Sequence, residues 1–278
     1  MSTKAIRRGR ATSAVLLLVV ALLTGCGLPA AGQPAAGPAP ADPVQAAQPA
    51  AGQLPAGHSV SAGVAPTPSP APAISYPATG GNRWSLAAAD TTPGRGSGGR
   101  LLRYRVAEER DIRGLPVAEV AEMISATLDD PRGWTAGGAW RLRRVGADSP
   151  ADFTIYLATP GTRDKLCQDR PDGYTSCRNG NRVVVNVARW VKGVPGYGAS
   201  LDAYRQYMIN HEVGHRLGFG HERCPAPGRP APTMQQQTLG LHGCTANAWP
   251  YPNGIRYAGP VGEYHDRLPP REGARPAH

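Results

Sequence analysis

Long apolar runs are scarce in this chain of 278 residues. The most apolar stretch, residues 11–23, is shorter than the roughly 20 residues that a membrane-spanning helix needs. It follows a basic start formed by Lys4, Arg7, Arg8 and Arg10. A short apolar run behind a basic start is typical of an export signal. The sequence therefore predicts a signal peptide over residues 1–25 and an exported chain.

Large apolar and charged side chains are almost missing from residues 27–98, where Ala, Pro and Gly dominate. Such a segment cannot bury enough apolar surface to offset the entropy of ordering its backbone. We therefore expect a disordered, partly extended tether over residues 26–98. A proline-rich recognition segment is the alternative, but the stretch offers no convincing aromatic-flanked core.

Lysine is also rare, with only Lys4, Lys165 and Lys192. The formal charge of +10 includes four charges of the export signal, which leaves about +6 in the mature chain. The arginines are spread without the basic-aromatic stripe of a nucleic-acid surface. We therefore expect no nucleic-acid partner, whereas attraction to an anionic cell envelope is compatible with the charge.

The signal ends in Leu23-Thr24-Gly25-Cys26, which resembles a bacterial lipobox. The resemblance implies that Cys26 is diacylated and becomes the first mature residue. Each buried acyl methylene favours membrane binding by about 0.8 kcal/mol, so two chains anchor a protein stably. We expect a lipid anchor on the outer face of the cytoplasmic membrane. Simple secretion after cleavage nearby is the alternative.

Residues 211–221 have the form H-E-x-x-H-x-x-G-x-x-H. Residues four apart share one face of an α-helix, so His211 and His215 present two imidazoles to one point. His221 can join them only if the helix stops, since on a continuing helix it would lie about 15 Å further along the axis. Gly218 supplies the stop, because glycine enters the left-handed conformation without penalty. The motif therefore predicts three metal-binding imidazoles.

Glu212 follows the first of these histidines and projects about 100° further round the helix, beside the metal and not on it. Three neutral imidazoles leave one coordination position open, which distinguishes a catalytic zinc from a structural one. The Glu212 carboxylate could take a proton from a zinc-bound water and pass it to the leaving amine. The motif thus predicts peptide hydrolysis by a zinc-activated water. The alternative is a surface helix with two histidines and a solvated glutamate.

A methionine thirteen residues after the last histidine completes a resemblance to the metzincin zinc endopeptidases. The resemblance implies that Met234 forms a tight turn beneath the three imidazoles. Glu222 resembles the astacin branch, although Gln236 stands where astacins and serralysins carry a tyrosine ligand. In place of a freed N-terminus, Glu222 is expected to meet Arg216 or Arg223.

Over residues 99–265 the chain resembles a group of actinobacterial lipoproteins with a metzincin-like domain. Alternation and β-branched content predict strands at residues 101–106, 140–145, 153–157 and 182–187. Helical periodicity predicts helices at residues 117–128 and 201–217. We expect an α+β, metzincin-like fold: a mixed twisted sheet, a backing helix, an active-site helix and a small irregular C-terminal subdomain. The strand at residues 183–187 is expected at the cleft rim, where an extended substrate can pair.

Without Cys26, the exported chain keeps four cysteines: Cys167, Cys177, Cys224 and Cys244. An even set is typical of disulfide bonding outside the cytoplasm, and three connectivities are open. Pairing between sequence neighbours is the simplest, so we expect Cys167–Cys177 and Cys224–Cys244. No cysteine is then left to block the zinc. Three nearby carboxylates lack EF-hand spacing, so a solvated loop is expected there instead of a calcium site: Asp164, Asp169 and Asp172.

Together these patterns predict a monomeric, exported zinc endopeptidase acting on proteins or peptides, with its domain over residues 99–265 and a flexible tail at 266–278. The alternative is a zinc-stabilised binding or structural module with little or no turnover. The intact Glu212 favours the enzyme, because a module that needs only the metal has no use for that carboxylate. Substrate specificity is not legible in the irregular segment after His221.

Overall fold

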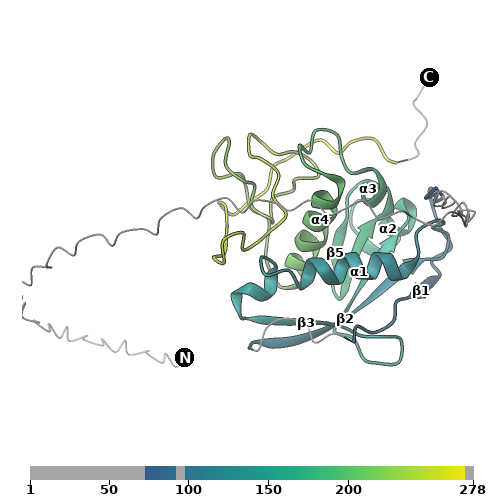
Figure 1. The fold of residues 1–278 in the computed structure, drawn as a ribbon. Coiled ribbons are helices and arrows are strands. Elements are labelled where there is room, and N and C mark those ends of the chain that lie inside the picture. The colour runs from purple at the N-terminus through teal and green to yellow at the C-terminus, as the bar shows by residue number, and fades with distance from the viewer. Residues whose placement is uncertain (1–72, 92–97, 273–278) are drawn as a thin grey trace, which may run out of the picture. The chain divides into compact units, whose positions relative to one another are not determined.

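The computed structural model describes residues 73–91 and 98–272, which contain a six-stranded mixed sheet (Figure 1). Its strands are β1 (Trp84–Leu86), β2 (Arg100–Glu109), β3 (Trp140–Arg144), β4 (Phe153–Ala158), β5 (Cys177–Asn179) and β6 (Arg182–Asn186). They lie in the order β1-β2-β4-β6-β5, and β3 also pairs with β2. Strands β2, β3, β4 and β6 are parallel, whereas β1 and β5 run antiparallel to their neighbours. The expected mixed sheet is confirmed.

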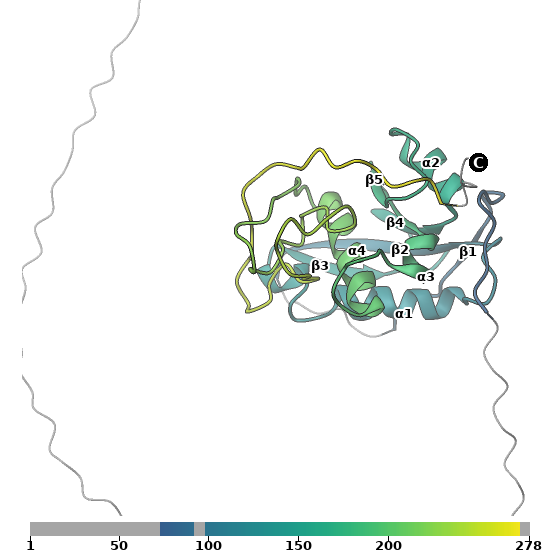
Figure 2. The ribbon, with the colours of Figure 1, turned by 90° about the horizontal axis from the view of Figure 1, so that it is seen from above.

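Four α-helices are found in the described ranges: α1 (Val117–Leu128), α2 (Pro160–Cys167), α3 (Val187–Lys192) and α4 (Leu201–Arg216). Of these, α1 and α4 have nearly the bounds that their apolar periodicity predicts. Helices α1, α3 and α4 pack against one another on one face of the sheet, and α2 covers the other face beside β5 and β6 (Figure 2). The fold is therefore α+β, with few helices.

Strand β6 is a central strand. Val183 and Val185 face the main core and Val184 faces the smaller cluster under α2, so all three are buried. A parallel strand covered on both faces needs such a continuous apolar run. Because β6 lies between β4 and β5, the expected placement of residues 183–187 at the cleft rim is wrong. The edge strand next to β6 is β5, which is too short and too polar to give a strand pattern.

The folded part begins earlier than residue 99. Strand β1 pairs with residues 107–109 of β2, and Ile74 and Tyr76 pack against the main core. The tether expected over residues 26–98 is therefore too long. The few large side chains near its end, including those of Ile74 and Tyr76, pack against the folded part. The expected signal peptide and Cys26 lie outside the described residues.

The described chain after α4 forms neither helix nor strand, as expected for a small irregular subdomain (Figure 1). Buried amide side chains hold it together. Gln237 donates to the carbonyl oxygens of Pro232 and Asn247, at 3.1 and 2.7 Å. The Asn247 amide in turn donates to the carbonyl oxygen of Ala231 at 2.9 Å. This part of the molecule therefore relies on directional hydrogen bonds more than on apolar packing.

The two disulfides expected from sequence proximity are both formed, Cys167–Cys177 and Cys224–Cys244. The flexible tail expected from residue 266 starts too early, because Glu272 pairs with Arg189 of α3 at 2.6 Å. Charged partners on distant elements thus fix residues that composition alone assigns to a tail.

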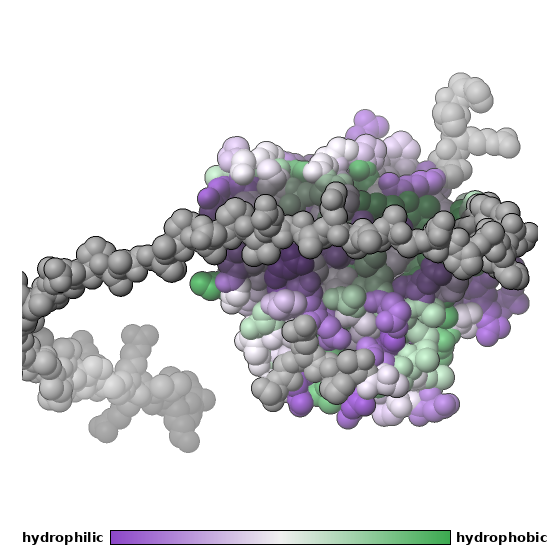
Figure 3. Space-filling model, in the orientation of Figure 1, coloured by the Kyte–Doolittle hydropathy of each residue, from purple (hydrophilic) through white to green (hydrophobic). Residues whose placement is uncertain are grey.

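Hydrophilic and hydrophobic residues are interspersed on the part of the surface that Figure 3 shows in colour. The large hydrophobic side chains exposed on the described residues are Leu86, Ile255 and Val261. None of the helices in the described ranges is long and apolar enough to cross a membrane.

Candidate metal centre

Helix α4 carries the first two histidines of the motif. Its N-terminus is capped by Ser200, whose hydroxyl accepts a hydrogen bond from the backbone N–H of Ala203 at 3.1 Å. At the other end Gly218 adopts a φ of 101°, and the N–H of Phe219 donates to the carbonyl oxygen of Gly214 at 3.0 Å. This positive φ ends the helix and turns the chain back, as the glycine at this position predicts.

The three imidazoles of His211, His215 and His221 meet through their Nε2 atoms. The Nε2 of His215 lies 3.1 Å from the Nε2 of His211 and 3.1 Å from that of His221. A tetrahedral zinc with Zn–N bonds of about 2.0–2.1 Å would place two imidazole nitrogens roughly 3.3 Å apart. The spacing of the three nitrogens therefore fits one ion between them.

Each ring is oriented by its other nitrogen. Nδ1 of His211 donates to the carbonyl oxygen of Thr233 at 2.9 Å, and Nδ1 of His215 donates to that of Phe219 at 2.8 Å. A carbonyl oxygen only accepts, so these Nδ1 atoms carry the protons and both Nε2 atoms offer lone pairs. Such outer partners fix the tautomer and raise the basicity of metal-binding histidines.

Burial keeps the His211 and His215 rings neutral. Desolvation, with the neighbouring imidazoles, holds the pKa of His211 well below its usual value. The pKa of His215 falls to about 4, mainly through burial. Neutral imidazole is the form that binds a metal, and a set of imidazole ligands suits zinc. The chemistry of the donor set therefore also fits a zinc ion.

Glu212 lies beside these rings in the same cavity. Its side chain is buried, and Oε2 has no hydrogen-bond partner among the described residues. Burial raises the pKa of Glu212 to about 8, although Arg163 and Arg178 oppose the shift. A cation held by the imidazoles would lower this pKa, because an opposite charge favours the carboxylate. Glu212 thus brings a carboxylate oxygen without a hydrogen-bond partner to the cavity that the imidazoles line.

Met234 is fully buried in a turn that is bonded to α4 and to the residue after the motif. Its carbonyl oxygen accepts from the N–H of Glu222 at 3.1 Å, and the next carbonyl, of Gln235, accepts from the hydroxyl of Tyr207 at 3.0 Å. A Cβ added at Gly214 would lie 2.4 Å from the Met234 sulfur. Gly214 therefore allows this close approach, a requirement that the motif pattern alone does not reveal.

Glu222 does not meet Arg216 or Arg223, which were the partners expected from sequence. It pairs with Arg256 at 2.8 Å and accepts from the N–H of Gly259 at 3.2 Å. The Arg256 guanidinium also lies over the rings of two aromatic residues, Trp134 and Phe219. Arg256 lies in the irregular segment, where sequence patterns assign no contacts.

A cavity of about 420 Å³ opens at the three imidazoles. One wall comes from Cys177 and Arg178 of β5, and α4 contributes Tyr207 and Met208. Gln236 also lines it. The cavity therefore runs between the edge strand β5 and the irregular subdomain, beside the three imidazoles.

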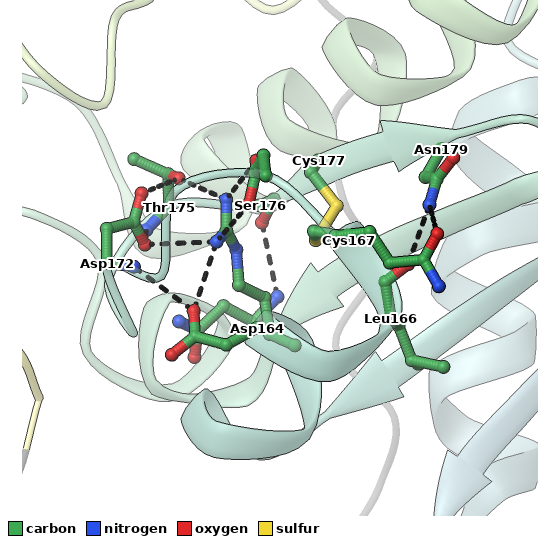
Figure 4. Close-up of a disulfide and its surroundings, with 12 residues drawn as sticks. Asp164, Leu166, Cys167, Asp172, Thr175, Ser176, Cys177 and Asn179 are labelled. Carbon is green, nitrogen blue, oxygen red and sulfur yellow. Dashed lines mark hydrogen bonds and ion pairs between the residues drawn. A yellow bond between two sulfur atoms is a disulfide. The ribbon is translucent and has the colours of Figure 1, made fainter.

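The Cys167–Cys177 disulfide joins α2 to β5 next to this cavity (Figure 4). Beside it, the buried guanidinium of Arg163 contacts three carboxylates, those of Asp164, Asp169 and Asp172, at 3.1, 3.0 and 3.5 Å. The solvated loop expected for these carboxylates is therefore wrong, because they form an ion-pair network. The cation that they hold is the guanidinium.

Residues 71–252 match the model of a family described as "Protein of unknown function (DUF3152)", so the chain belongs to that family. The matched range includes the three histidines and Met234, and it begins close to the observed start of the fold. No curated protein and no solved structure matches the chain.

Proposed function

We propose that this member of the DUF3152 family is a zinc-dependent endopeptidase of the metzincin type. The observation that carries the proposal is the convergence of three Nε2 atoms, with two Nδ1 protons donated to backbone carbonyls. Spacing, tautomer and charge state all favour one zinc ion at this point. Proteins or peptides would be the substrates.

A zinc ion at this site would lower the pKa of a bound water and polarise the scissile carbonyl. Glu212 would take the proton from the attacking water and deliver it to the leaving amine. Its free Oε2 is available for this task. Because the side chain is buried, water competes little with the substrate for it, and its interactions are stronger than at the surface.

The fold supports the metzincin assignment. The backing helix α1 and the ligand helix α4 lie on one face of a mixed sheet, and the Met234 turn accepts bonds from α4 and from Glu222. The antiparallel edge strand β5 lines the cavity. An extended peptide could therefore add to β5 beside the metal.

A zinc-stabilised binding or structural module is the competing function. Such a module gains nothing from Glu212, since a buried carboxylate oxygen without a partner costs free energy. Destabilising groups of this kind persist where activity requires them. Glu212 therefore favours the enzyme.

The location of the enzyme is part of the proposal. Two disulfides support an oxidising compartment, because thiols stay reduced in the cytosol. With the export signal and lipobox-like Cys26, this favours a monomer anchored by lipid to the outer face of the cytoplasmic membrane.

The proposal is tested by incubating the purified chain with a peptide library, first as isolated, then with a chelator, then with zinc restored. We expect cleavage that the chelator removes and zinc restores. A chain that binds one equivalent of zinc and cleaves no peptide would favour the module instead.

A further inference from the structure

Residues 264–272 form an extended segment that turns alternate side chains towards the protein. Tyr264, Asp266 and Leu268 are partly buried, whereas His265 and Arg267 are exposed. A period of two is that of an extended chain with one packed face. The segment lies beyond the range matched by the family model, which ends at residue 252.

Its first contacts are with the irregular subdomain. The Tyr264 ring stacks on the imidazole of His242, with the ring centroids 3.5 Å apart. The Asp266 carboxylate contacts Nε2 of the same imidazole at 2.9 Å. Two inward side chains of the segment therefore both contact His242 of the subdomain.

The middle of the segment borders the cavity at the three imidazoles. Leu268 lines this cavity together with the three histidines, Glu212 and Leu239. An apolar side chain placed there covers surface that would otherwise face water. Pro269 and Pro270 follow, and they have no N–H to pair with an edge strand.

The end of the segment is fixed to the opposite side of the cavity. Arg271 pairs with the buried carboxylate of Asp164 at 2.5 Å, and Glu272 pairs with Arg189 and Lys192. A Cβ at Gly173 would lie 2.6 Å from Cγ of Arg271, so this glycine leaves room for the arginine.

Figure 2 shows the yellow end of the chain running from the irregular loops past β5 towards α2. The segment therefore joins the two walls between which the cavity opens. Specific contacts hold both of its ends, and Leu268 near its centre lines the cavity that the three imidazoles also line.

We infer that residues 264–272 occupy the peptide-binding groove of the proposed enzyme, so that the chain blocks its own cleft until this segment is displaced. The blocking of catalysis rests on the proposed function, whereas the position of the segment in the groove is inferred from its contacts alone. A tethered segment competes at an effective concentration in the millimolar range, so even a weak intrinsic affinity keeps the groove largely filled.

The test uses a fluorescent peptide with the sequence of residues 264–272 and three forms of the full chain. These are the wild type, the double variant Leu268→Asp/Arg271→Ala, and the control Arg267→Ala on the exposed side of the segment. The double variant keeps every cavity residue outside the segment and changes only the contacts of the segment itself. We expect it to bind the peptide at least about tenfold more tightly than the wild type and the control. Equal binding by all three forms would overturn the inference.

Hydrolysis of a library peptide by the same three forms tests the blocking. We expect the double variant to be several-fold faster than the other two. Tighter peptide binding with an unchanged rate in an active enzyme would overturn the block. Tighter binding with no hydrolysis by any form would refute the endopeptidase function but would still support occupation of the groove by residues 264–272.

Discussion

The Glu263 carboxylate accepts a hydrogen bond from Nδ1 of His221 at 2.8 Å. The third imidazole is thus oriented by a side chain, whereas the other two are oriented by backbone carbonyls. Two residues before Glu263, Val261 forms an isolated β-bridge with Glu222, which directly follows the motif. Between them, the N–H of Gly262 donates to the carbonyl oxygen of His221. The orientation of the His221 imidazole therefore depends on a part of the chain far beyond the motif.

Glu263→Ala should weaken zinc binding by about ten- to a hundredfold, the usual cost of losing an outer partner of a metal-binding histidine. Competition with a chromophoric chelator measures the change. Glu272→Gln is the matched control, because Glu272 contacts Arg189 and Lys192 instead of a metal-binding ring. Equal zinc affinity in both variants would contradict the role of Glu263.

Glu212→Gln should abolish peptide hydrolysis while zinc remains near one equivalent per chain, because Glu212 lies beside the metal-binding rings and not among them. Stability should be unchanged or higher, since the variant no longer buries a carboxylate without a partner. Metal analysis, a cleavage assay and thermal unfolding on one sample decide the matter. Cleavage at the wild-type rate would exclude Glu212 as the base.

Gly214→Ala should destabilise the ligand helix against the methionine turn. The added Cβ would lie 2.4 Å from the Met234 sulfur and 2.6 Å from the Trp134 ring, so side chains must shift at a cost of about 1–3 kcal/mol. Denaturant unfolding measures this cost. Gly220→Ala is the control, because nothing lies within 4 Å of a Cβ there. Equal stability of the two variants would show that the turn adapts freely.

Cys244→Ser should weaken zinc retention more than it destabilises the sheet. The Cys224–Cys244 bond closes the segment that carries Met234, and a loop of this length contributes about 3 kcal/mol in the chain-entropy model. Chelator competition and circular dichroism follow the two effects separately. Cys177→Ser removes the other disulfide and should leave zinc retention closer to that of the wild type. An unchanged zinc affinity in Cys244→Ser would contradict the expected dependence of zinc retention on the Cys224–Cys244 disulfide.

Cys26→Ser should move the protein from the membrane fraction into the medium, because the acyl chains would supply most of the membrane affinity. Fractionation after a high-salt wash without detergent measures the distribution. A variant that stays on the membrane through this wash would refute the lipid anchor.

The sequence predicts the elements whose residues repeat a pattern. Helices α1 and α4 have apolar positions at helical spacing, and β2, β4 and β6 alternate or run apolar, so they lie where expected. The motif names three histidines because the covalent chain itself brings them to one end of α4. The approximate arrangement of the three histidines can therefore be predicted from the local sequence.

The rest depends on contacts between residues far apart in sequence. Strand β1 lies in a stretch rich in Ala, Pro and Gly, and β5 has only three residues, so neither repeats a pattern. Helix α2 has no strong apolar stripe, because it packs through small residues and a buried arginine. The partners Glu263 and Arg256 are single charged residues in an irregular segment, and nothing nearby identifies them.

The amide scaffold of Gln237 and Asn247 gives the irregular wall of the cleft a particular character. Its bonds depend on one another. The backbone carbonyl of Asn247 accepts from the side-chain amide of Gln237, and the backbone N–H of Asn247 donates to Oε1 of Gln237. The side-chain amide of Asn247 donates in turn to the carbonyl oxygen of Ala231. Losing one amide leaves buried acceptors unpaired on several turns at once. We therefore expect substitutions at Gln237 or Asn247 to disrupt the folding of this wall, whereas substitutions of its exposed residues should be tolerated.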